Sequence, residues 1–414
     1  MDRIARIRIA NLRSIEHVEL DLSPLTVLIG ENGSGKSTIV EALELLRKAS
    51  EPSFVQQVHA VHRGLAGLLR KGATNLTLGV VIEDDDLVQP SVEYLVTLLD
   101  TVGGAEVVRE WLVVRSRTDA EPVLFVLRRE GSTGEMLDAK GEAYVRVPQP
   151  AMASNQLVLT SFGAVPPHAA FARVLAMLRG IEVHLPFDTL AAWAARSHQF
   201  SLSLRTSTPL FPTERLNLLG FNFASAWAAL RNRGSTDWDH TMRLVRLGLG
   251  EGIDSVNVDP AAGGGLVAVS VKRTDLAQPI PASDLSDGQL SWLAFVAMTR
   301  LHPDRSLLAI DEPESHLHPS LLGRVVSLLV EMEGRAPVLV ATHSDRVLEL
   351  LDDPADAVRV CQSDERGVSS VHRLDPAELP VWLKEFGDLG ELRQSGYLSR
   401  VVLPATSSSD EATP

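Results

Sequence analysis

Residues 25–46 read LTVLIGENGSGKSTIVEALELL, and this stretch decides the fold. Its first five residues are a short, apolar, partly β-branched run of the kind that forms a buried strand. Residues 37–46 repeat apolar side chains at helical spacing. A strand, a glycine-rich loop and a helix in this order are the context of a phosphate-binding loop. The stretch therefore predicts a nucleotide-binding α/β domain.

The phosphate chemistry follows from the residue types in this loop. Its glycines allow tight backbone turns and bring N–H groups close to a phosphate, where the helix N-terminus adds a favourable dipole. Lys36 supplies a positive charge to the β- and γ-phosphate oxygens, and the Ser37 hydroxyl is a ligand for Mg²⁺. GxxxxGK[ST] between a strand and a helix is far more specific than an ordinary glycine turn. The predicted cofactors are ATP and Mg²⁺, with ATP contacts at Gly30, Asn32, Gly33, Ser34, Gly35, Lys36, Ser37 and Thr38.

Length and composition bound the class of protein. The chain has 414 residues, too many for one compact core, so we expect two or three structural units. No apolar run is long enough for a membrane span, and residues 1–20 lack the continuous apolar core of a signal peptide. The single Cys361 excludes an internal disulfide and a cysteine-built zinc site, and fits a buried hydrophobe in a reducing cytosol. We therefore expect a cytoplasmic protein without membrane contact.

The chain is acidic, with 39 basic and 53 acidic residues and a formal net charge of −14. This balance argues against a surface covered in positive potential for nucleic acid. A local basic groove stays open as an alternative, so DNA is a partner that the overall charge does not favour.

The segments around the phosphate loop differ in periodicity. Strands are predicted on its N-terminal side at residues 4–12 and 18–22. Beyond the helix, extended segments separated by glycine turns predict an antiparallel sheet with one solvated face, at residues 75–82, 91–98, 110–115, 123–129 and 143–147. Helical spacing follows at residues 166–179, 191–196 and 222–231, and residues 253–273 return to strand around a glycine turn at 263–265.

A second set of chemical groups lies near the C-terminal end of the sequence. Ser286 and Gly288 stand at the entrance of a strongly apolar helix, where an ordinary N-cap is the alternative interpretation. The buried strand at 306–310 ends in Asp311 and Glu312, which suit metal binding and orientation of an attacking water. The next predicted strand, 338–341, leads to His343, which can hydrogen-bond a γ-phosphate; a loop histidine is the alternative.

Four motifs in order carry a family resemblance: GENGSGKS (30–37), LSDGQ (285–289), LLAIDEPESHLHP (307–319) and ATHS (341–344). They resemble the Walker A, signature, Walker B/D-loop and switch-histidine motifs of ABC-type ATPases. More closely, they resemble the RecF/SMC/OLD-like branch, of which NLRS (11–14), DEPE (311–314) and HLHP (316–319) are typical. The resemblance covers most of the chain. About two thirds of the chain separates Lys36 from Asp311, so the intervening segments interrupt the nucleotide domain.

The resemblance implies an α/β fold: an ABC-type P-loop ATPase head with an antiparallel β-subdomain and a helical insert. It implies catalytic roles for Glu312 and His343, and metal binding by Ser37 and Asp311. In an ATP-dependent homodimer, the partner's nucleotide would contact Ser286, Gly288 and Gln289. Arg13 is a further predicted nucleotide contact, with a solvated loop residue as the alternative. The division expected is residues 1–159 for the first half of the head, 160–250 for the insert, 251–403 for the second half and 404–414 for a disordered tail.

Two features depart from the family pattern. Asp287 stands where many relatives have glycine, which places a carboxylate near the γ-phosphate of ATP bound to the partner copy. This carboxylate could slow closure of the dimer by repulsion or simply cap the helix. The glutamine that usually contacts the metal between the Walker motifs is not assigned by the sequence, and Gln156 is the nearest candidate.

Three functional classes follow. The leading one is an ATPase switch that drives a protein partner or effector in DNA repair, genome maintenance or anti-phage defence. The alternatives are a DNA-binding RecF-like repair protein and an ATPase sensor subunit of a nuclease or toxin defence system. A built-in nuclease is not expected, because the segment after His343 is short and its carboxylates are predicted to lie in solvated loops: Asp352, Asp353, Asp356, Asp364 and Glu365.

Overall fold

The computed structural model describes residues 2–86, 88–116, 123–138, 140–163, 165–190, 203–261, 265–302, 304–333 and 336–403. The predicted helix at 191–196, most of the glycine turn at 263–265 and the predicted disordered tail at 404–414 lie outside them. None of the helices in these ranges is long and apolar enough to cross a membrane.

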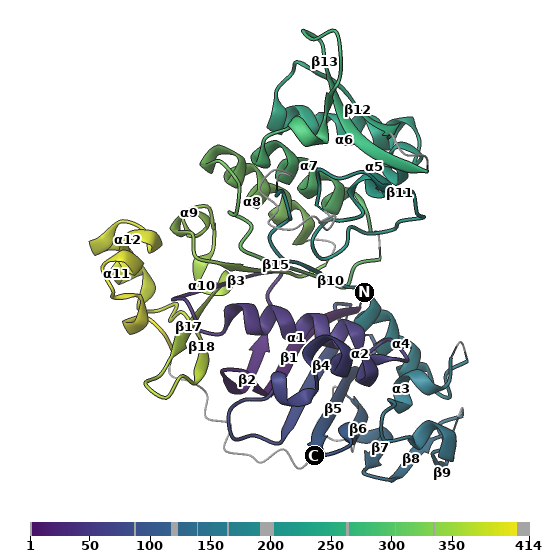
Figure 1. Ribbon diagram of the computed structural model, residues 1–414. Helices are drawn as coiled ribbons and strands as arrows, with labels where there is room; N and C mark the ends of the chain where they lie inside the picture. Colours follow the sequence, from purple (N-terminus) through teal and green to yellow (C-terminus); the bar gives the residue numbers. More distant parts are fainter. Residues whose placement is uncertain are drawn as a thin grey trace.

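Among the described residues, 14 strands form one large mixed sheet in the order β10-β15-β16-β3-β17-β18-β2-β1-β4-β5-β6-β7-β8-β9 (Figure 1). Its first five strands are parallel to one another. Their carboxyl ends therefore lie at one edge, which is where ligands bind in parallel sheets. These strands are β10 (Ile181–His184), β15 (Leu307–Asp311), β16 (Val338–Thr342), β3 (Leu25–Gly30) and β17 (Val358–Ser363).

The parallel strands are apolar along their whole length because both of their faces are covered. In β3, Leu28 packs into one hydrophobic core, while its neighbours Val27 and Ile29 pack into the other. Figure 1 shows these strands edge-on, with α1 on one side and α7 and α8 on the other. The bounds of these helices are α1 (Lys36–Lys48), α7 (Asp287–Arg300) and α8 (Pro319–Glu333).

The predicted antiparallel β-subdomain is present, and it continues the same sheet. β18 pairs in parallel with β2 through Ser369 and Ile15, and the antiparallel strands follow from there. Sequence reasoning missed β8, which lies between the predicted segments 123–129 and 143–147, because the chain turns within two residues after β7 and resumes as a strand at Thr133. The strands are β18 (Ser369–Arg373), β2 (Ile15–Asp21), β1 (Asp2–Leu12), β4 (Asn75–Asp84), β5 (Ser91–Thr101), β6 (Gly104–Arg115), β7 (Leu124–Glu130), β8 (Thr133–Leu137) and β9 (Tyr144–Arg146). The helices of the chain between β3 and β10, besides α1, are α2 (Phe54–His62), α3 (Val158–Ser161) and α4 (Ala169–Arg179).

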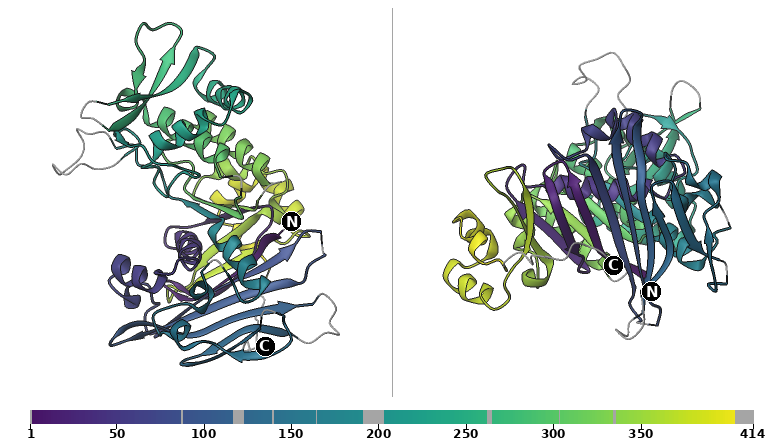
Figure 2. Two further views of the ribbon diagram at one scale, coloured as in Figure 1. Left: turned by 90° about the vertical axis from the view of Figure 1, so that its right-hand side faces the viewer. Right: turned by 90° about the horizontal axis from the view of Figure 1, so that it is seen from below.

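A second unit stands above the parallel strands (Figures 1 and 2), where helices α5 and α6 pack on α7 and the small sheet of β11 to β14 packs against α5 and α6. The Trp292 indole of α7 donates to the Leu244 carbonyl at 3.2 Å and lies so close to Gly248 that no side chain would fit there. The predicted helical insert thus contains α5 and α6, but strand β10 of the main sheet was not expected within it. The elements are β11 (Thr208–Pro209), α5 (Phe223–Arg231), α6 (Ser235–Leu249), β12 (Ile253–Pro260), β13 (Leu266–Arg273) and β14 (Ile280–Pro281).

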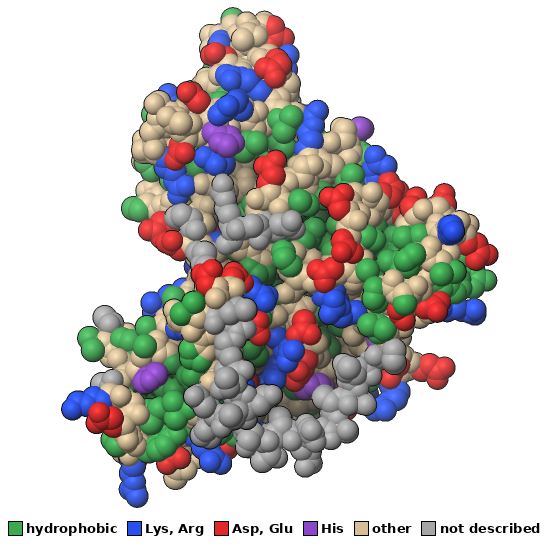
Figure 3. Space-filling view, turned by 180° about the vertical axis from the view of Figure 1, so that it is seen from behind, with side chains coloured by type: hydrophobic (Ala, Val, Ile, Leu, Met, Phe, Trp, Pro, Cys, Tyr) green, Lys and Arg blue, Asp and Glu red, His purple; other side chains and the backbone are tan. Residues whose placement is uncertain are grey.

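The C-terminal helices lie at the left of Figure 1, where α12 packs against α9 and α11. Trp382 and Phe386 stack with their ring centroids 5.9 Å apart, and Tyr397 joins them. On the face seen from behind, acidic and basic side chains are interspersed (Figure 3). The helices are α9 (Asp345–Leu348), α10 (Pro354–Ala357), α11 (Leu379–Phe386) and α12 (Leu389–Gln394).

Candidate functional site

The phosphate loop connects β3 to α1, as the sequence predicts, and two of its glycines are sterically required. A side chain at Gly30 would collide with the Cys361 carbonyl of β17. Gly35 has a φ of 97°, and a Cβ there would lie 2.5 Å from the Ser369 hydroxyl oxygen. Only glycine combines this backbone conformation with this close approach. The loop is therefore held between the parallel strands and β18.

Lys36 lies folded back inside the loop. Its side chain is buried, with the residue only 4% exposed, and Nζ donates to the carbonyls of Gly30 at 2.9 Å and Glu31 at 3.0 Å. Burial lowers the pKa of Lys36, and the nearby Cys361 and Asp311 oppose this shift. A buried ammonium with two carbonyl partners is ready to exchange them for phosphate oxygens, which bind a cation more strongly.

Asp311 ends β15 next to the phosphate loop. The residue is 7% exposed, and its buried Oδ1 has no hydrogen-bond partner among the described residues. Burial raises the pKa of Asp311, while a hydrogen bond from Ser37 lowers it. A buried carboxylate oxygen without a partner, next to a serine hydroxyl, is a donor set that fits Mg²⁺, a cation that prefers oxygen ligands. Ser37 and Asp311 are thus brought together as the sequence predicts.

Glu312 and His343 face each other at the ends of neighbouring strands. The distance from His343 Nε2 to Glu312 Oε1 is 3.7 Å, and both side chains are partly open to solvent. Glu312 has a φ of 46°, a conformation that non-glycine residues adopt rarely, and its N–H donates to the Ala341 carbonyl at 2.7 Å. Glu312 thus leaves β15 at the carboxyl edge of the sheet with its side chain beside His343, and its role in orienting a water stays a prediction.

Two residues that sequence reasoning did not assign hold His343 in place. Glu314 Oε1 accepts hydrogen bonds from the Thr342 hydroxyl at 2.7 Å and from the His343 N–H at 2.9 Å. Arg393 of α12 donates to the His343 carbonyl at 3.0 Å and to Asp345 at 2.5 Å. The motif DEPE contains Glu314, so a signal for it was present in the sequence. No local signal links Arg393 to a histidine 50 residues earlier.

Arg13 lies in the turn between β1 and β2, with a φ of 49°. Its guanidinium donates to both carboxylate oxygens of Glu41 on α1, one of them at 2.7 Å. Arg13 is therefore fixed against the first turns of α1, the helix that follows the phosphate loop. Its contact with nucleotide stays a prediction.

Gln156 lies in the β-subdomain, where its carbonyl accepts from Arg129 of β7 at 2.8 Å. Seven strands separate β7 from β3 in the sheet order, so this part of the chain is far from the phosphate loop. Gln156 is therefore not placed to contact a metal at Asp311. Next to β15, the segment that leaves the carboxyl edge of the sheet is the one that follows β10.

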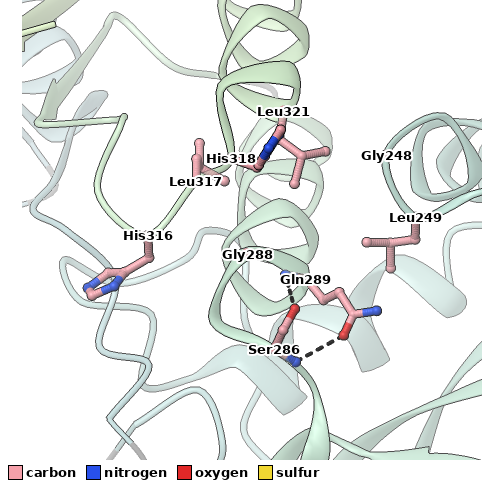
Figure 4. Close-up of a pocket in the computed structure, with 9 residues that line it drawn as sticks. All are labelled: Gly248, Leu249, Ser286, Gly288, Gln289, His316, Leu317, His318 and Leu321. Carbon is pink, nitrogen blue, oxygen red and sulfur yellow. Dashed lines mark hydrogen bonds between the residues drawn. The ribbon is translucent and has the colours of Figure 1, made fainter.

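Residues 285–289, the signature segment, begin α7. Ser286 and Gln289 form a capping box: Ser286 Oγ accepts from the Gln289 N–H at 3.3 Å, and Gln289 Oε1 accepts from the Ser286 N–H at 2.9 Å (Figure 4). A Cβ at Gly288 would lie 3.3 Å from the His316 carbonyl. Ser286 thus caps α7, and it is also the serine that the signature motif would place against a partner's nucleotide.

The signature segment opens on a surface hollow of about 490 Å³ (Figure 4). Within the described structure, its lining includes no residue of the phosphate loop; the lining residues are Gly248, Leu249, Ser286, Gly288, Gln289, His316, Leu317, His318 and Leu321. The signature segment therefore faces outward.

The acidic residues after His343 serve local structural roles. Asp353 caps α10 by accepting from the Asp356 N–H, and Asp356 pairs with Arg373 at 3.1 Å. Asp364 accepts backbone N–H groups of Arg366 and Val368 in a turn. In the part of the chain that the structure describes, no group of three or more His, Cys, Asp or Glu residues is arranged to hold a metal ion.

Comparisons with known proteins agree with this geometry. Residues 3–101 match the family model described as "AAA ATPase domain", and residues 241–349 match "AAA domain, putative AbiEii toxin, Type IV TA system". The chain is 42% identical over 51 residues to an OLD nuclease of Thermus scotoductus, a match that spans 12% of this chain and only 10% of that relative.

Two solved structures are similar in fold. One is the SmcHead bound to the C-winged helix domain of ScpA, with a TM-score of 0.53 and 14% identity over 92% of this chain and 99% of that chain. The other is the Smc head domain with an extended coiled coil bound to the C-terminal domain of ScpA, derived from Pyrococcus furiosus, with a TM-score of 0.51 and 13% identity over 93% of this chain and 99% of that chain.

The fold and the ordered motifs define an ABC-type P-loop ATPase head. The AAA ATPase matches and the local identity to an OLD nuclease, together with a fold similar to Smc heads, support the RecF/SMC/OLD-like resemblance of the sequence motifs.

Proposed function

We propose that this chain binds ATP with Mg²⁺ and hydrolyses the bond between its β- and γ-phosphates, which yields ADP and phosphate. The observation that carries the proposal is the convergence of Lys36, Asp311, Glu312 and His343 at one edge of the parallel strands. About two thirds of the chain separates Lys36 from Asp311, yet each influences the pKa of the other. Chance does not bring these residue types together at a strand edge beside a phosphate loop.

In this proposal each residue has a distinct task. The loop N–H groups and Lys36 bind the phosphates, while Ser37 and Asp311 hold Mg²⁺, which neutralises charge on the β- and γ-phosphate oxygens. Glu312 orients and polarises the attacking water, and His343 hydrogen-bonds the γ-phosphate. Glu314 and Arg393 fix the backbone of His343 from both sides, so that its ring keeps its position beside Glu312.

We further propose that two copies close head to tail around ATP. The phosphate loop of one copy would face residues 285–289 of the other, and the hydrolysis step would open the dimer. Ser286 is exposed, and the hollow that it lines with Gly288 and Gln289 includes no described residue of the phosphate loop, which supports contact with a second copy. The expected division assigns residues 1–159 and 251–403 to the two halves of the head and 160–250 to the insert, but β10 (Ile181–His184) belongs to the main sheet and β12 to β14 pack with α5 and α6.

Lys36→Ala tests the nucleotide site directly. The variant should bind ATP at least about tenfold more weakly, because the loop amides remain but a charge-assisted contact is lost. Isothermal titration calorimetry with a non-hydrolysable ATP analogue measures the affinity. Lys48→Ala, at the other end of α1 and 3.8 Å from Glu44, is the matched control and should bind normally. Equal affinities of the two variants would contradict the site.

We propose that the ATPase cycle drives a protein partner or effector in the cytoplasm. This partner would act in DNA repair, genome maintenance or defence. A second candidate, an ATPase sensor subunit of a nuclease or toxin defence system, is supported by the name of one relative, an OLD nuclease, and by the family model described as "AAA domain, putative AbiEii toxin, Type IV TA system". An ATP-dependent pull-down with Glu312→Gln protein from its own cells would identify the partner, because a closed state should retain it.

The purified protein should not cut DNA with Mg²⁺ or Mn²⁺, with or without ATP. The reason is that Asp353, Asp356 and Asp364 are engaged in capping, ion pairing and a turn. A plasmid-nicking assay checks this. Nuclease activity that co-purifies through several columns and disappears in the Asp352, Asp353 and Asp356 alanine variant would assign the cutting to this chain.

A further inference from the structure

The carboxylate that the sequence places unusually in the signature segment has a partner from a distant part of the chain. Asp287 Oδ1 accepts a hydrogen bond from Arg205 Nη2 at 2.6 Å. The Asp287 side chain is 51% exposed, whereas the Arg205 side chain is only 10% exposed. The ion pair thus joins a buried guanidinium to a carboxylate at the surface.

Arg205 also holds the backbone that leads into the signature segment. Its Nη1 donates to the carbonyls of Ser283 at 2.9 Å and Leu285 at 2.6 Å, with a longer contact to Ala282, and its Nε donates to the Thr189 carbonyl at 2.7 Å. An ordinary surface ion pair is flexible and contributes little. Here the planar guanidinium is fixed by carbonyls on two sides, which also fixes its bond to Asp287.

Charge at this position matters for the proposed dimer. The N-terminus of α7 attracts anions through its free N–H groups and its dipole. An unpaired carboxylate on the first residue of that helix would repel a γ-phosphate brought by the second copy, because like charges at close range oppose each other strongly at a partly buried site. The Arg205 guanidinium supplies the opposite charge at the same place.

We propose that Arg205 is a positioning residue of the signature segment: it shapes residues 283–287 and neutralises Asp287, so that the start of α7 can accept the γ-phosphate of ATP bound to a second copy of this chain. This inference rests on the head-to-tail dimer proposed above. Of the two consequences considered for Asp287, repulsion is then the one that Arg205 prevents.

The test measures ATP-dependent dimer formation by sedimentation in a Glu312→Gln parent, which traps the closed state. Adding Arg205→Gln should weaken association about tenfold or more. Adding Asp287→Asn to that variant should return association to within a few-fold of the parent, because the unpaired charge is gone. Higher salt should also relieve part of the Arg205→Gln defect, since screening weakens repulsion between exposed charges.

A role limited to holding carbonyls would give a different pattern. Asp287→Asn would not rescue Arg205→Gln, and salt would not help, because neither change restores the bonds to Ser283 and Leu285. That result would overturn the charge-neutralisation proposal. ATP affinity at protein concentrations too low for dimers should stay unchanged in every variant, and the melting temperature shows whether each one is folded.

Arg273→Gln is the matched control. Its guanidinium pairs with Asp275 at 2.9 Å at the end of β13 and, among the described residues, has no hydrogen bond to residues 283–287, so its loss should leave association unchanged. If Arg205→Gln is not folded, Arg205→Lys keeps the positive charge but loses the planar fork that holds the carbonyls of Ser283 and Leu285, so charge neutralisation predicts association within a few-fold of the parent. A tenfold loss in Arg205→Lys that Asp287→Asn does not reverse would overturn the charge-neutralisation proposal. Absence of ATP-dependent association in the parent itself would overturn the proposed dimer and this inference together, whereas an associating parent with an unaffected Arg205→Gln variant overturns this inference alone.

Discussion

Glu312→Gln is expected to bind ATP with unchanged affinity and to hydrolyse it at least on the order of 100-fold more slowly than the wild type. The amide has nearly the same shape as the carboxylate, and it tolerates the backbone φ of 46° equally well, so the fold at the end of β15 should not change. What the variant loses is the negative charge that is proposed to polarise the attacking water. That charge lies 3.7 Å from His343, measured from Glu312 Oε1 to His343 Nε2. The loss therefore falls on the reaction step and not on binding.

Single-turnover hydrolysis and calorimetric ATP binding separate these two effects. Glu331→Gln, an exposed carboxylate on α8, is the control for a general effect of charge and should turn over normally. Turnover of Glu312→Gln near the wild-type rate would mean that another group positions the water, and His343 with its supports Glu314 and Arg393 would then be the next to change.

Mixing two inactive variants should restore activity if the site is shared between copies. Ser286→Arg adds bulk and charge at the signature segment, and Lys36→Ala disables the phosphate loop, so each homodimer should be inactive. In a mixed dimer both changes fall in one composite site, and the other site keeps an intact Lys36 and an intact Ser286. With random exchange and independent sites, recovery should approach roughly a quarter of wild-type activity.

The steady-state ATPase rate of a titrated mixture measures this recovery, and chemical cross-linking of differently tagged chains shows that mixed dimers form. Two copies of the same inactive variant, mixed at equal total concentration, are the control. Mixed dimers that form and bind ATP but show no recovery would mean either strict coupling between the sites or a signature that acts within its own chain.

The sequence by itself determined the local chemistry of the candidate site. The phosphate loop is defined by its glycines, and two of them, Gly30 and Gly35, face groups that leave no room for a side chain. Asp311 ends a strand whose five residues are all buried, and Glu312 follows it; an apolar run predicts such a strand. Such features depend on a few neighbouring residues, so they can be derived without the rest of the fold.

The same holds for most strands and helices, but not for all of them. β10 has four buried residues directly after α4, and so short an apolar run cannot be distinguished from the end of a helix by its periodicity. Only its pairing with β15 makes it a strand of the main sheet. The division into β-subdomain and head also looked sharper in the sequence than it is, since one sheet runs through both.

Tertiary structure alone decided which distant residues support the site. Arg205 reaches Asp287 across 82 residues, and Arg393 reaches the His343 carbonyl across 50. A long guanidinium side chain can serve any carbonyl or carboxylate within its reach, so its own sequence neighbourhood carries no sign of the partner. The sequence determines the groups that contact phosphate because those groups are local, whereas the residues that orient and neutralise them are chosen by the packing of elements far apart in the chain.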